Sequence, residues 1–408
     1  MFIKRCLLGF YSVVLMLNAV QAETVPTESI EELSGKDASL VVIEPESDGL
    51  ISEISGEDVS SWLGLQPYGV VMGGWAAGGY NYNTENPQQG NNGPVSMTDQ
   101  SGAVNLYQMD FFIEKAIAKG VAWDIGGRFD YMFGTDTRYT QAAGNWDASL
   151  MSKNNYYNMA MPQAYAEIFA PIGHGLSAKF GHFYTIIGYE SVPSGPNFFS
   201  SHSYSFKSSP FTTTGALFNY AINQEWGLNF GAVTGPDNFN SQSGAWSQMS
   251  GLTWNNVRTG TTAIFSIMSG NVYEDKSSEQ VYYSAILQQA FGKWTYVLEH
   301  DRGTQQNAIS QGQTAEWYSI VNYLTYQTTE TTGLGVRGEW FNDVNGFRYD
   351  KGAANFYQVT VGLNWKPKHW LMIRPEVRYD WSQAQIAAFD NGQRSDQILL
   401  GFDTLIQF

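Results

Sequence analysis

The sequence predicts an all-β fold: a transmembrane, antiparallel, up-and-down β-barrel of about sixteen strands. Three observations predict it. Stretches of ten or more residues alternate apolar and polar side chains, the links between them alternate between short and long, and Trp residues cluster where the stretches end. A tilted membrane strand needs about 9–11 residues, whereas strands of soluble sandwiches are mostly shorter.

The stretch "LMIRPEVRYDW" (371–381) shows the alternation most clearly. One row of side chains is apolar, and the other is largely charged: Arg374, Glu376, Arg378 and Asp380. Burying Arg on the lipid side of a barrel costs about 2–4 kcal/mol near the membrane midplane. The charged row is therefore expected to face the lumen and the apolar row the lipid.

Sixteen stretches of this kind follow one another, and a count between fourteen and eighteen fits the pattern. They lie near 65–83, 103–117, 120–134, 160–171, 174–184, 211–222, 225–234, 247–256, 260–270, 278–290, 293–303, 315–327, 331–342, 355–366, 369–383 and 394–408. "FFIEKAIAK" (111–119) is assigned to a strand because Tyr107, Met109 and Phe111 alternate with polar residues. Short periplasmic turns alternating with long extracellular loops are typical of such barrels.

Aromatic residues are expected to form two interfacial belts, because Trp and Tyr prefer the boundary between lipid and water. Beside the short links lie Trp62, Trp123, Trp226, Trp254, Trp294, Trp365 and Trp370. Toward the long links lie Trp317, Trp340 and Trp381.

The start of the chain predicts export. Lys4 and Arg5 precede an apolar run that ends in "AVQA", so we expect a signal peptide at 1–22 that is cleaved after Ala22. The one cysteine, Cys6, lies inside it. Residues 23–60 are acidic and are expected to form a flexible or partly helical periplasmic segment before a barrel at 61–408. A plug or a partner-binding arm is the alternative for this segment.

Composition and motifs exclude several classes of function. The mature chain would have 20 basic and 38 acidic residues, and no basic patch indicates nucleic-acid binding. "GLGVRG" (333–338) begins a strand instead of linking a strand to a helix, and "DVNGFRYD" (343–350) lacks the acidic twelfth position of a calcium loop. "EHD" (299–301) and "SHSYS" (201–205) could suggest a catalytic rim, but they form no defined triad. We expect no enzyme activity, no cofactor and no metal.

Several stretches resemble the OmpL-like family of β-barrel porins. They are "YMFGTD" (131–136), "KFGHFYTIIGYE" (179–190), "PFTTTGALFNYAI" (210–222), "GVRGEWFNDVNGFR" (335–348), "VGLNWKPKHWLMIRPEVRYDWS" (361–382) and "LGFDTLIQF" (400–408). The resemblance implies an outer-membrane pore of a Gram-negative bacterium. It names no solute.

The expected function is passive diffusion of small hydrophilic solutes and ions through a water-filled channel, because sixteen strands enclose more space than side chains fill. Charged side chains should line the pore and set ion preference: Asp124, Arg128, Asp130, Glu167, Lys179, Arg337, Glu339, Arg374, Glu376, Arg378 and Asp380. The excess of acid predicts a weak preference for cations. Mutual pairing that merely stabilises the wall is the alternative reading of these charges.

The long link 185–210 is a candidate for a loop that folds into the lumen and narrows it. Its candidate constriction residues are Tyr189, Glu190, Phe198, Phe199 and Lys207. The terminal strand, with Phe402, Ile406 and Phe408 on one face, resembles the signal read by the barrel-assembly machinery. Lipid and a homo-oligomeric partner are the other expected contacts. A surface barrel that binds a partner through its long loops, in the manner of an adhesin, remains an alternative function.

Overall fold

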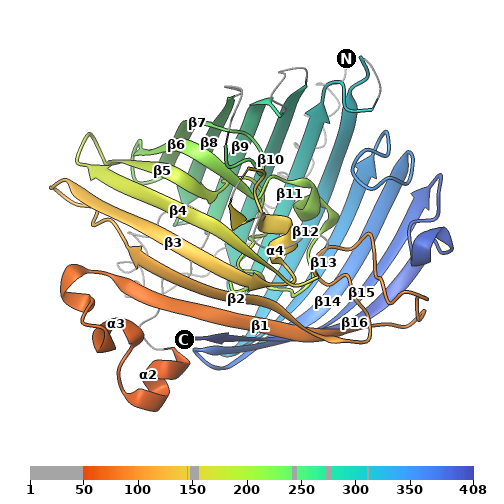
Figure 1. The fold of residues 1–408 in the computed structure, drawn as a ribbon, viewed down its shortest axis with the longest axis horizontal. Helices are drawn as coiled ribbons and strands as arrows, with labels where there is room; N and C mark the ends of the chain where they lie inside the picture. Colours follow the sequence, from red (N-terminus) through yellow and green to blue (C-terminus); the bar gives the residue numbers. More distant parts are fainter. Residues whose placement is uncertain (1–48, 145, 148–155, 241–245, 273–277, 310–311) are drawn as a thin grey trace. The chain divides into compact units, whose positions relative to one another are not determined.

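The computed structural model describes residues 49–144, 146–147, 156–240, 246–272, 278–309 and 312–408. All of them belong to the second of two compact units, Ala38–Phe408. Sixteen antiparallel strands in this unit close into one barrel, in which each strand pairs with its neighbours in sequence (Figure 1). The first strand pairs with the last, so the sheet has no free edge.

The strands are long and follow one another with few helices between them. They are β1 (Val71–Asn83), β2 (Val104–Lys115), β3 (Asp124–Gly134), β4 (Asn158–Ala170), β5 (Leu176–Tyr184), β6 (Thr212–Ala221), β7 (Trp226–Val233), β8 (Ser247–Asn256), β9 (Thr261–Asn271), β10 (Glu279–Phe291), β11 (Trp294–Gln305), β12 (Ala315–Thr329), β13 (Thr332–Asp343), β14 (Ala354–Lys368), β15 (Leu371–Ala384) and β16 (Asp396–Gln407). The short helices are α2 (Leu50–Ser55), α3 (Val59–Trp62), η3 (Gln66–Tyr68), α4 (Thr137–Thr140), α6 (Tyr204–Ser208) and η4 (Asp390–Gly392).

The predicted fold class is confirmed, and every predicted stretch overlaps one strand of the barrel. The first boundary is wrong by six residues. Residues 66–68 form the 3₁₀ helix η3, which ends at Gly69 with a φ of +66°. A strand cannot run through this left-handed turn, so β1 begins only at Val71.

The alternation along β15 separates two environments. Val377 is 50% exposed, whereas Arg378 beside it is 1% exposed. The apolar row therefore faces outward and the charged row faces the interior, as the sequence predicted. Outward-facing residues on other strands are likewise large and apolar, such as Phe111, Phe265 and Val361. This distribution is that of a barrel solvated by lipid.

Two expected orientations are wrong. Tyr107 was grouped with Met109 on one face, but a bulge where β2 pairs with β1 reverses the alternation. Tyr107 is consequently buried inside, where its hydroxyl accepts a hydrogen bond of 2.6 Å from Asn81. Trp317 was expected in an interfacial belt, but it is 1% exposed and fills the space above Gly303 inside the barrel.

The segment before β1 folds against one rim of the barrel. Asp58 caps α3 by accepting a hydrogen bond from the amide of Ser61 at 2.8 Å. The Glu53 carboxylate in α2 pairs with Lys368 at 2.8 Å and accepts a hydrogen bond from Trp370. The predicted signal peptide and most of the acidic segment lie outside the described residues, so those assignments stay predictions.

None of the helices that the structure describes is both long enough and apolar enough to cross a membrane.

Replacing Val377 by Arg tests the lipid-facing assignment. Val377 lies midway along the outward row of β15, so Val377→Arg should lower the free energy of unfolding by about 2–4 kcal/mol in lipid vesicles. Gln383→Arg, on the same face near the end of β15, should cost only about 0–1 kcal/mol. Urea titrations of both variants measure the difference, and equal costs would contradict the assignment.

Candidate functional site

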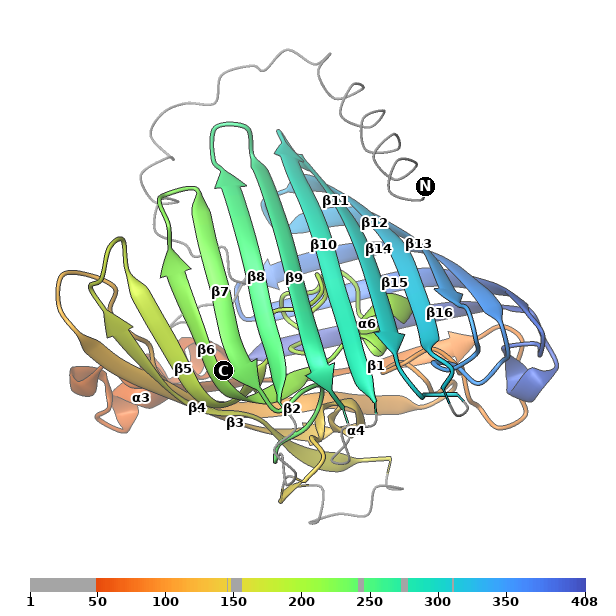
Figure 2. The ribbon, with the colours of Figure 1, turned by 90° about the horizontal axis from the view of Figure 1, so that it is seen from above.

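The link between β5 and β6 lies inside the barrel. We name residues 185–211 the inserted loop; it contains α6, which Figure 2 shows enclosed by the strands. Its contacts reach β2, β11, β13 and β15, so it extends across the lumen. The structure thus places this loop inside the barrel, and its role in narrowing a channel stays a prediction.

Three arginines of the wall donate hydrogen bonds to backbone carbonyls of the inserted loop. Arg374 donates to the carbonyls of Ser194 and Asn197 at 2.8 and 2.7 Å. Arg378 donates to the carbonyl of His202, and Arg337 to that of Ser201 at 2.6 Å. Each guanidinium also pairs with a carboxylate, so these buried cations are neutralised while they bind the loop.

The carboxylates of the same wall accept hydrogen bonds from the loop. Glu376 accepts from the amides of Ser200 and Ser201 at 3.0 and 3.1 Å. Glu339 accepts from the amides of Tyr204 and Ser205 at 2.8 and 2.7 Å. Each of these two carboxyl groups thus binds two successive backbone amides of the loop.

Asp380 completes the set on β15. It accepts a hydrogen bond of 2.7 Å from the hydroxyl of Tyr204 and pairs with Arg378 at 2.7 Å. The charged row on β13 and β15 therefore fastens the loop by both its donors and its acceptors.

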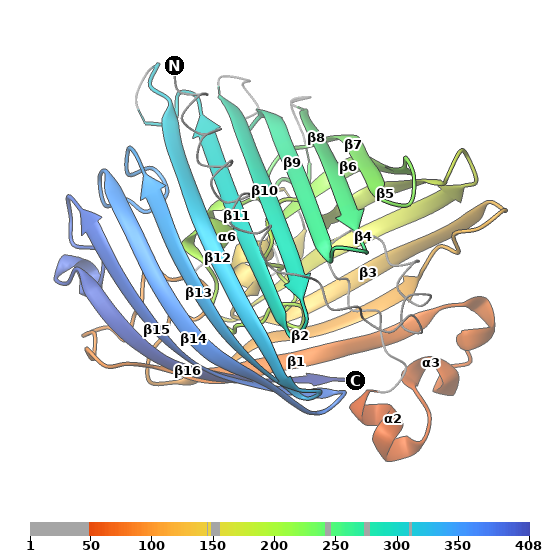
Figure 3. The same cartoon turned by 180° about the vertical axis from the view of Figure 1, so that it is seen from behind.

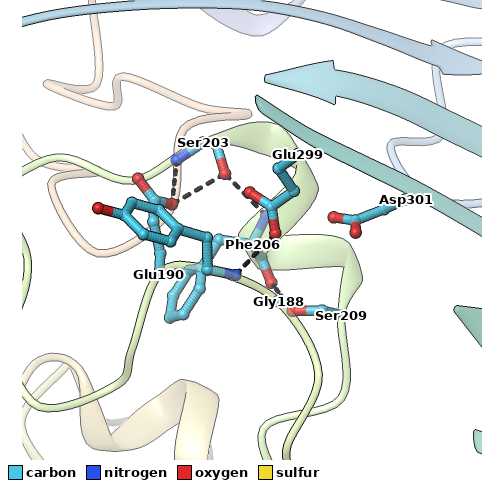
Figure 4. Close-up of a pocket in the computed structure, with 8 residues that line it drawn as sticks. Gly188, Glu190, Ser203, Phe206, Ser209, Glu299 and Asp301 are labelled. Carbon is cyan, nitrogen blue, oxygen red and sulfur yellow. Dashed lines mark hydrogen bonds between the residues drawn. The ribbon is translucent and has the colours of Figure 1, made fainter. Parts of the chain in front are cut away.

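Glu190 contributes a charge from the loop itself. Burial alone would raise the pKa of Glu190, but the Arg337 guanidinium at 2.6 Å, His202 and the hydrogen bonds from Ser203 together lower that pKa below its usual value. Figure 4 shows Glu190 and Ser203 of the loop opposite Glu299 and Asp301 of β11. These residues line a small pocket together with Gly188 and Phe206.

The wall has glycines where the loop has aromatic rings. A Cβ at Gly335 would lie 2.3 Å from the Phe198 ring, and one at Gly362 would lie 3.1 Å from the Phe199 ring. Phe198 and Phe199 pack against each other with ring centroids 4.9 Å apart. Gly333 and Gly335 of "GLGVRG" thus make room for a side chain of the loop.

The interior is packed at the level of the inserted loop. Every strand has at least one buried, inward-facing side chain: Trp75, Gln108, Asp130, Ala160, Phe183, Leu217, Val233, Met249, Met268, Tyr282, Val297, Val321, Arg337, Gln358, Arg374 and Asp403. Apolar clusters join the wall to Ile187, Val192 and Phe206 of the loop. The loop therefore fills much of the lumen in this state.

The other predicted pore-lining residues lie on β3 to β5, away from this network. Arg128 pairs with Glu114 and with the buried Asp130, at 2.7 and 2.6 Å. Glu167 lies opposite Lys179 in the pairing of β4 with β5.

Two of these residues have further contacts. The Lys179 ammonium lies 4.6 Å from the Tyr165 ring. Asp124, at the start of β3, pairs with Lys115 at 2.9 Å near the rim. A role of these residues in selecting solutes stays a prediction.

The remaining candidates of the loop are also placed inside. Tyr189 packs on Tyr323 of β12, and its amide donates to Glu299 at 2.7 Å. The Lys207 ammonium donates to the carbonyl of Pro94 at 3.0 Å, and burial lowers the pKa of Lys207 to about 8.

The residues of the expected assembly signal lie on β16 or just after it. Phe402 is 48% exposed on the outer face, and Ile406 pairs with Ala76 of β1 and Leu371 of β15. The Phe408 amide donates to the carbonyl of Gly74 at 2.9 Å, and its ring packs on Phe111.

Sequence reasoning missed several residues that bind the loop. Gln108 donates to the carbonyl of Val192 at 2.8 Å and accepts from the amide of Ser194 at 3.0 Å. Glu299 and Asp301 were read only as part of "EHD", yet both face the loop from β11. The alternation along β11 places Glu299 and Asp301 on the inward row. Because buried polar side chains need hydrogen-bond partners, this placement could have predicted that both contact the loop.

The two histidine motifs do not form a catalytic site in the described residues. His300 accompanies Glu299 and Asp301 in sequence but lies on the opposite face of β11, beside Tyr283. Ser203 caps α6, and His202 stacks on Phe206. Within the described part of the chain, no group of three or more His, Cys, Asp or Glu residues is arranged to hold a metal ion.

Asp136 connects the loop after β3 to the same network. It is 2% exposed and accepts hydrogen bonds from Gln108 at 3.0 Å and Thr135 at 3.2 Å. Arg138 pairs instead with Asp99. Burial therefore raises the pKa of Asp136 to about 7.

A closed sixteen-stranded barrel with an apolar outer face and a loop folded into a charged interior defines a porin-type barrel of the outer membrane. The chain belongs to the family described as putative beta-barrel porin-2, OmpL-like, whose model matches residues 69–408. No curated protein matches the sequence.

Solved structures share the fold at low sequence identity. The anion-selective porin from Comamonas acidovorans has a TM-score of 0.56 at 10% identity, over 83% of this chain and 99% of that one. OprB of Pseudomonas putida has a TM-score of 0.59 at 13% identity, over 89% and 99%. The trimer form of OmpT from Vibrio cholerae has a TM-score of 0.51 at 9% identity, over 83% and 99%.

Filling the space under Phe198 should release the loop. In Gly335→Val the added side chain overlaps the ring, and overpacking of this kind costs about 1–3 kcal/mol. With Ser194→Cys as a reporter, since Ser194 is 6% exposed, maleimide labelling should become faster. Gly338→Val is the matched control on the same strand, because a Cβ there meets nothing within 4 Å. Equal labelling rates in both variants would show that packing of the Phe198 ring against Gly335 is not needed to hold the loop inside the barrel.

Asp136 should make the stability of the barrel depend on pH. Its pKa is higher in the folded protein than in the unfolded chain, so its favourable contribution is present below about pH 4 and is lost as the pH rises toward 7. The loss should be on the order of 2–4 kcal/mol, and Asp136→Asn should remove it. Urea titrations from pH 4 to 8 measure this, and an unchanged slope in the variant would contradict the assignment.

Proposed function

We propose that this protein is an outer-membrane porin for passive diffusion of small hydrophilic solutes and ions, in which the inserted loop controls passage. The observation that carries the proposal is the fastening of residues 185–211 to the charged wall inside a sixteen-stranded barrel. A barrel of 16–18 strands is wide enough for an aqueous channel unless something fills it. In this protein the inserted loop fills much of the lumen. The width of the channel therefore depends on the position of the loop.

The charged wall acts as an anchor in this proposal. Arg337, Arg374 and Arg378 are each 0–1% exposed, so they meet loop atoms instead of ions in solution. Removing one partner of a buried ion pair costs about 3–5 kcal/mol, which makes spontaneous release of the whole loop rare. Permeation would then depend on smaller displacements of the loop.

Other contacts of the chain are part of the proposal. The apolar outer face would meet lipid, and the last strand would be read by the barrel-assembly machinery. A homo-oligomer is proposed because the OmpT neighbour is recorded in a trimer form. Neither a catalytic role nor a cofactor is proposed.

A second candidate is a surface barrel that binds a partner through its long loops. The packed interior favours it, because a barrel that never conducts would use its loops for something other than transport.

Single-channel recording in planar bilayers tests the proposal. The mature chain should give small stepwise openings. Deletion of 193–206, which removes most loop contacts with Glu339, Glu376 and Arg374, should give steps several-fold larger, because the lumen is then unfilled. Heat-modifiable mobility on gels is the control that the variant is a folded barrel. A folded deletion variant that does not conduct would reject the channel and favour the partner-binding barrel.

A further inference from the structure

The charges inside this barrel are confined to part of its circumference. Strands β6, β7, β8 and β9 contain no Asp, Glu, Lys or Arg, and the one charged residue of β10, Glu279, is exposed at the strand's start on its outward row. Figure 3 shows these strands side by side along one side of the barrel. Five consecutive strands of the wall thus present an uncharged inner surface.

This surface changes character along the barrel. At the level of the inserted loop it is apolar and buried, with Leu217, Val233 and Met249 in the packed cluster. Toward the links 222–225, 257–260 and 292–293 it becomes polar and half-exposed. We name the polar part the amide–hydroxyl wall; its residues are Asn219, Asn229, Asn255, Thr262 and Gln288.

Strand pairing places these side chains in adjoining positions. Thr262 lies opposite Asn255 on one side and opposite Gln288 on the other, so a row crosses three strands. Asn219 lies opposite Asn229. Neighbouring strands are about 4.8 Å apart, so the row presents hydrogen-bonding groups at that interval.

Much of the hydrogen-bonding capacity of this wall remains unused. Asn219 donates to Asn229 at 2.9 Å, and Thr262 donates to Asn255 at 3.2 Å. Among the described residues, the Gln288 amide group has no protein partner. Because amides and hydroxyls both donate and accept, such a row matches a solute whose groups also do both.

The charged side of the same half of the barrel carries paired acids and bases. Glu114 pairs with Arg128 at 2.7 Å, and Glu167 lies opposite Lys179. The strong charges of β13 and β15 are buried under the loop. A solute that passes along β6 to β10 in this half of the lumen therefore meets no charged side chain on the inward rows of those strands.

We propose that the amide–hydroxyl wall is a binding track for uncharged, hydroxyl-rich solutes such as sugars and polyols. This inference rests on the proposed function. A charged solute gains no counter-charge from the wall, yet it must shed part of its hydration to contact it. A neutral polyol exchanges its water hydrogen bonds for equivalent ones with amides and hydroxyls.

Two measurements on the full mature chain in vesicles test the assignment. Swelling should be several-fold faster with maltose than with lactobionate, a sugar acid of the same size, and the reversal potential in a KCl gradient should lie near zero. Gln288→Glu should change the cation-to-anion permeability ratio by about fivefold, because a fixed charge then lies about 4 Å from the ion path. Gln289→Glu makes the same change on the outward row and should leave the ratio unchanged.

The outcomes separate the two proposals. Conductance with equal swelling for both solutes, or an unchanged ratio in Gln288→Glu, would overturn the binding track and leave the porin standing. Absence of both swelling and conductance, also in the variant lacking 193–206, would reject the porin itself.

Discussion

The structure depends on one constraint: the buried arginines and carboxylates of β13 and β15 must find partners where water does not reach them. An unpaired buried charge is far more costly than a polar contact, so each such group needs a counter-charge and hydrogen bonds. Arg374 meets this need with Asp403 and with carbonyls of the inserted loop. The backbone of residues 185–211 supplies hydrogen-bond partners to the charged side chains of the wall. Those side chains in turn determine where the backbone lies.

As a consequence, strands β11 to β15 and strands β6 to β10 differ in what their inward side chains contact. On β11 to β15, charged side chains and glycines fasten the loop, so few of them face an open path. On β6 to β10, side chains carry no charge toward the interior, and the polar ones near the short links are half-exposed. The acidic composition alone suggested a weak preference for cations, whereas the binding track that we propose on β6 to β10 would take neutral solutes.

Much of the fold follows from local pattern. Alternation with a period of two predicted sixteen strands and the inward face of Arg374 and Arg378, because each strand has one face in lipid. The pattern could not locate the bulge that turns Tyr107 inward, since a bulge is set by how two strands pair. Trp317 was misplaced for a related reason: only the fold shows that Gly303 leaves space for it inside.

The site was predictable only in its outline. The length and central position of 185–210 indicated an inserted loop. Loop partners of the charged row are backbone amides and carbonyls 134 to 180 residues away, such as the amide of Ser201 for Glu376. The sequence does not indicate which backbone groups will bind a side chain. Likewise, only the structure shows that the Phe198 ring packs against Gly335.

Hydrogen exchange of the loop amides tests the central claim most directly. The protein would be measured in lipid nanodiscs by mass spectrometry, with peptides covering 198–206. If the wall holds the loop, the amides of Ser200, Ser201, Tyr204 and Ser205 should exchange as slowly as those of the strands. Glu376→Gln should accelerate Ser200 and Ser201 more than Tyr204 and Ser205, which bind Glu339. Exchange of all four at the rate of an exposed link, such as 257–260, would contradict the account.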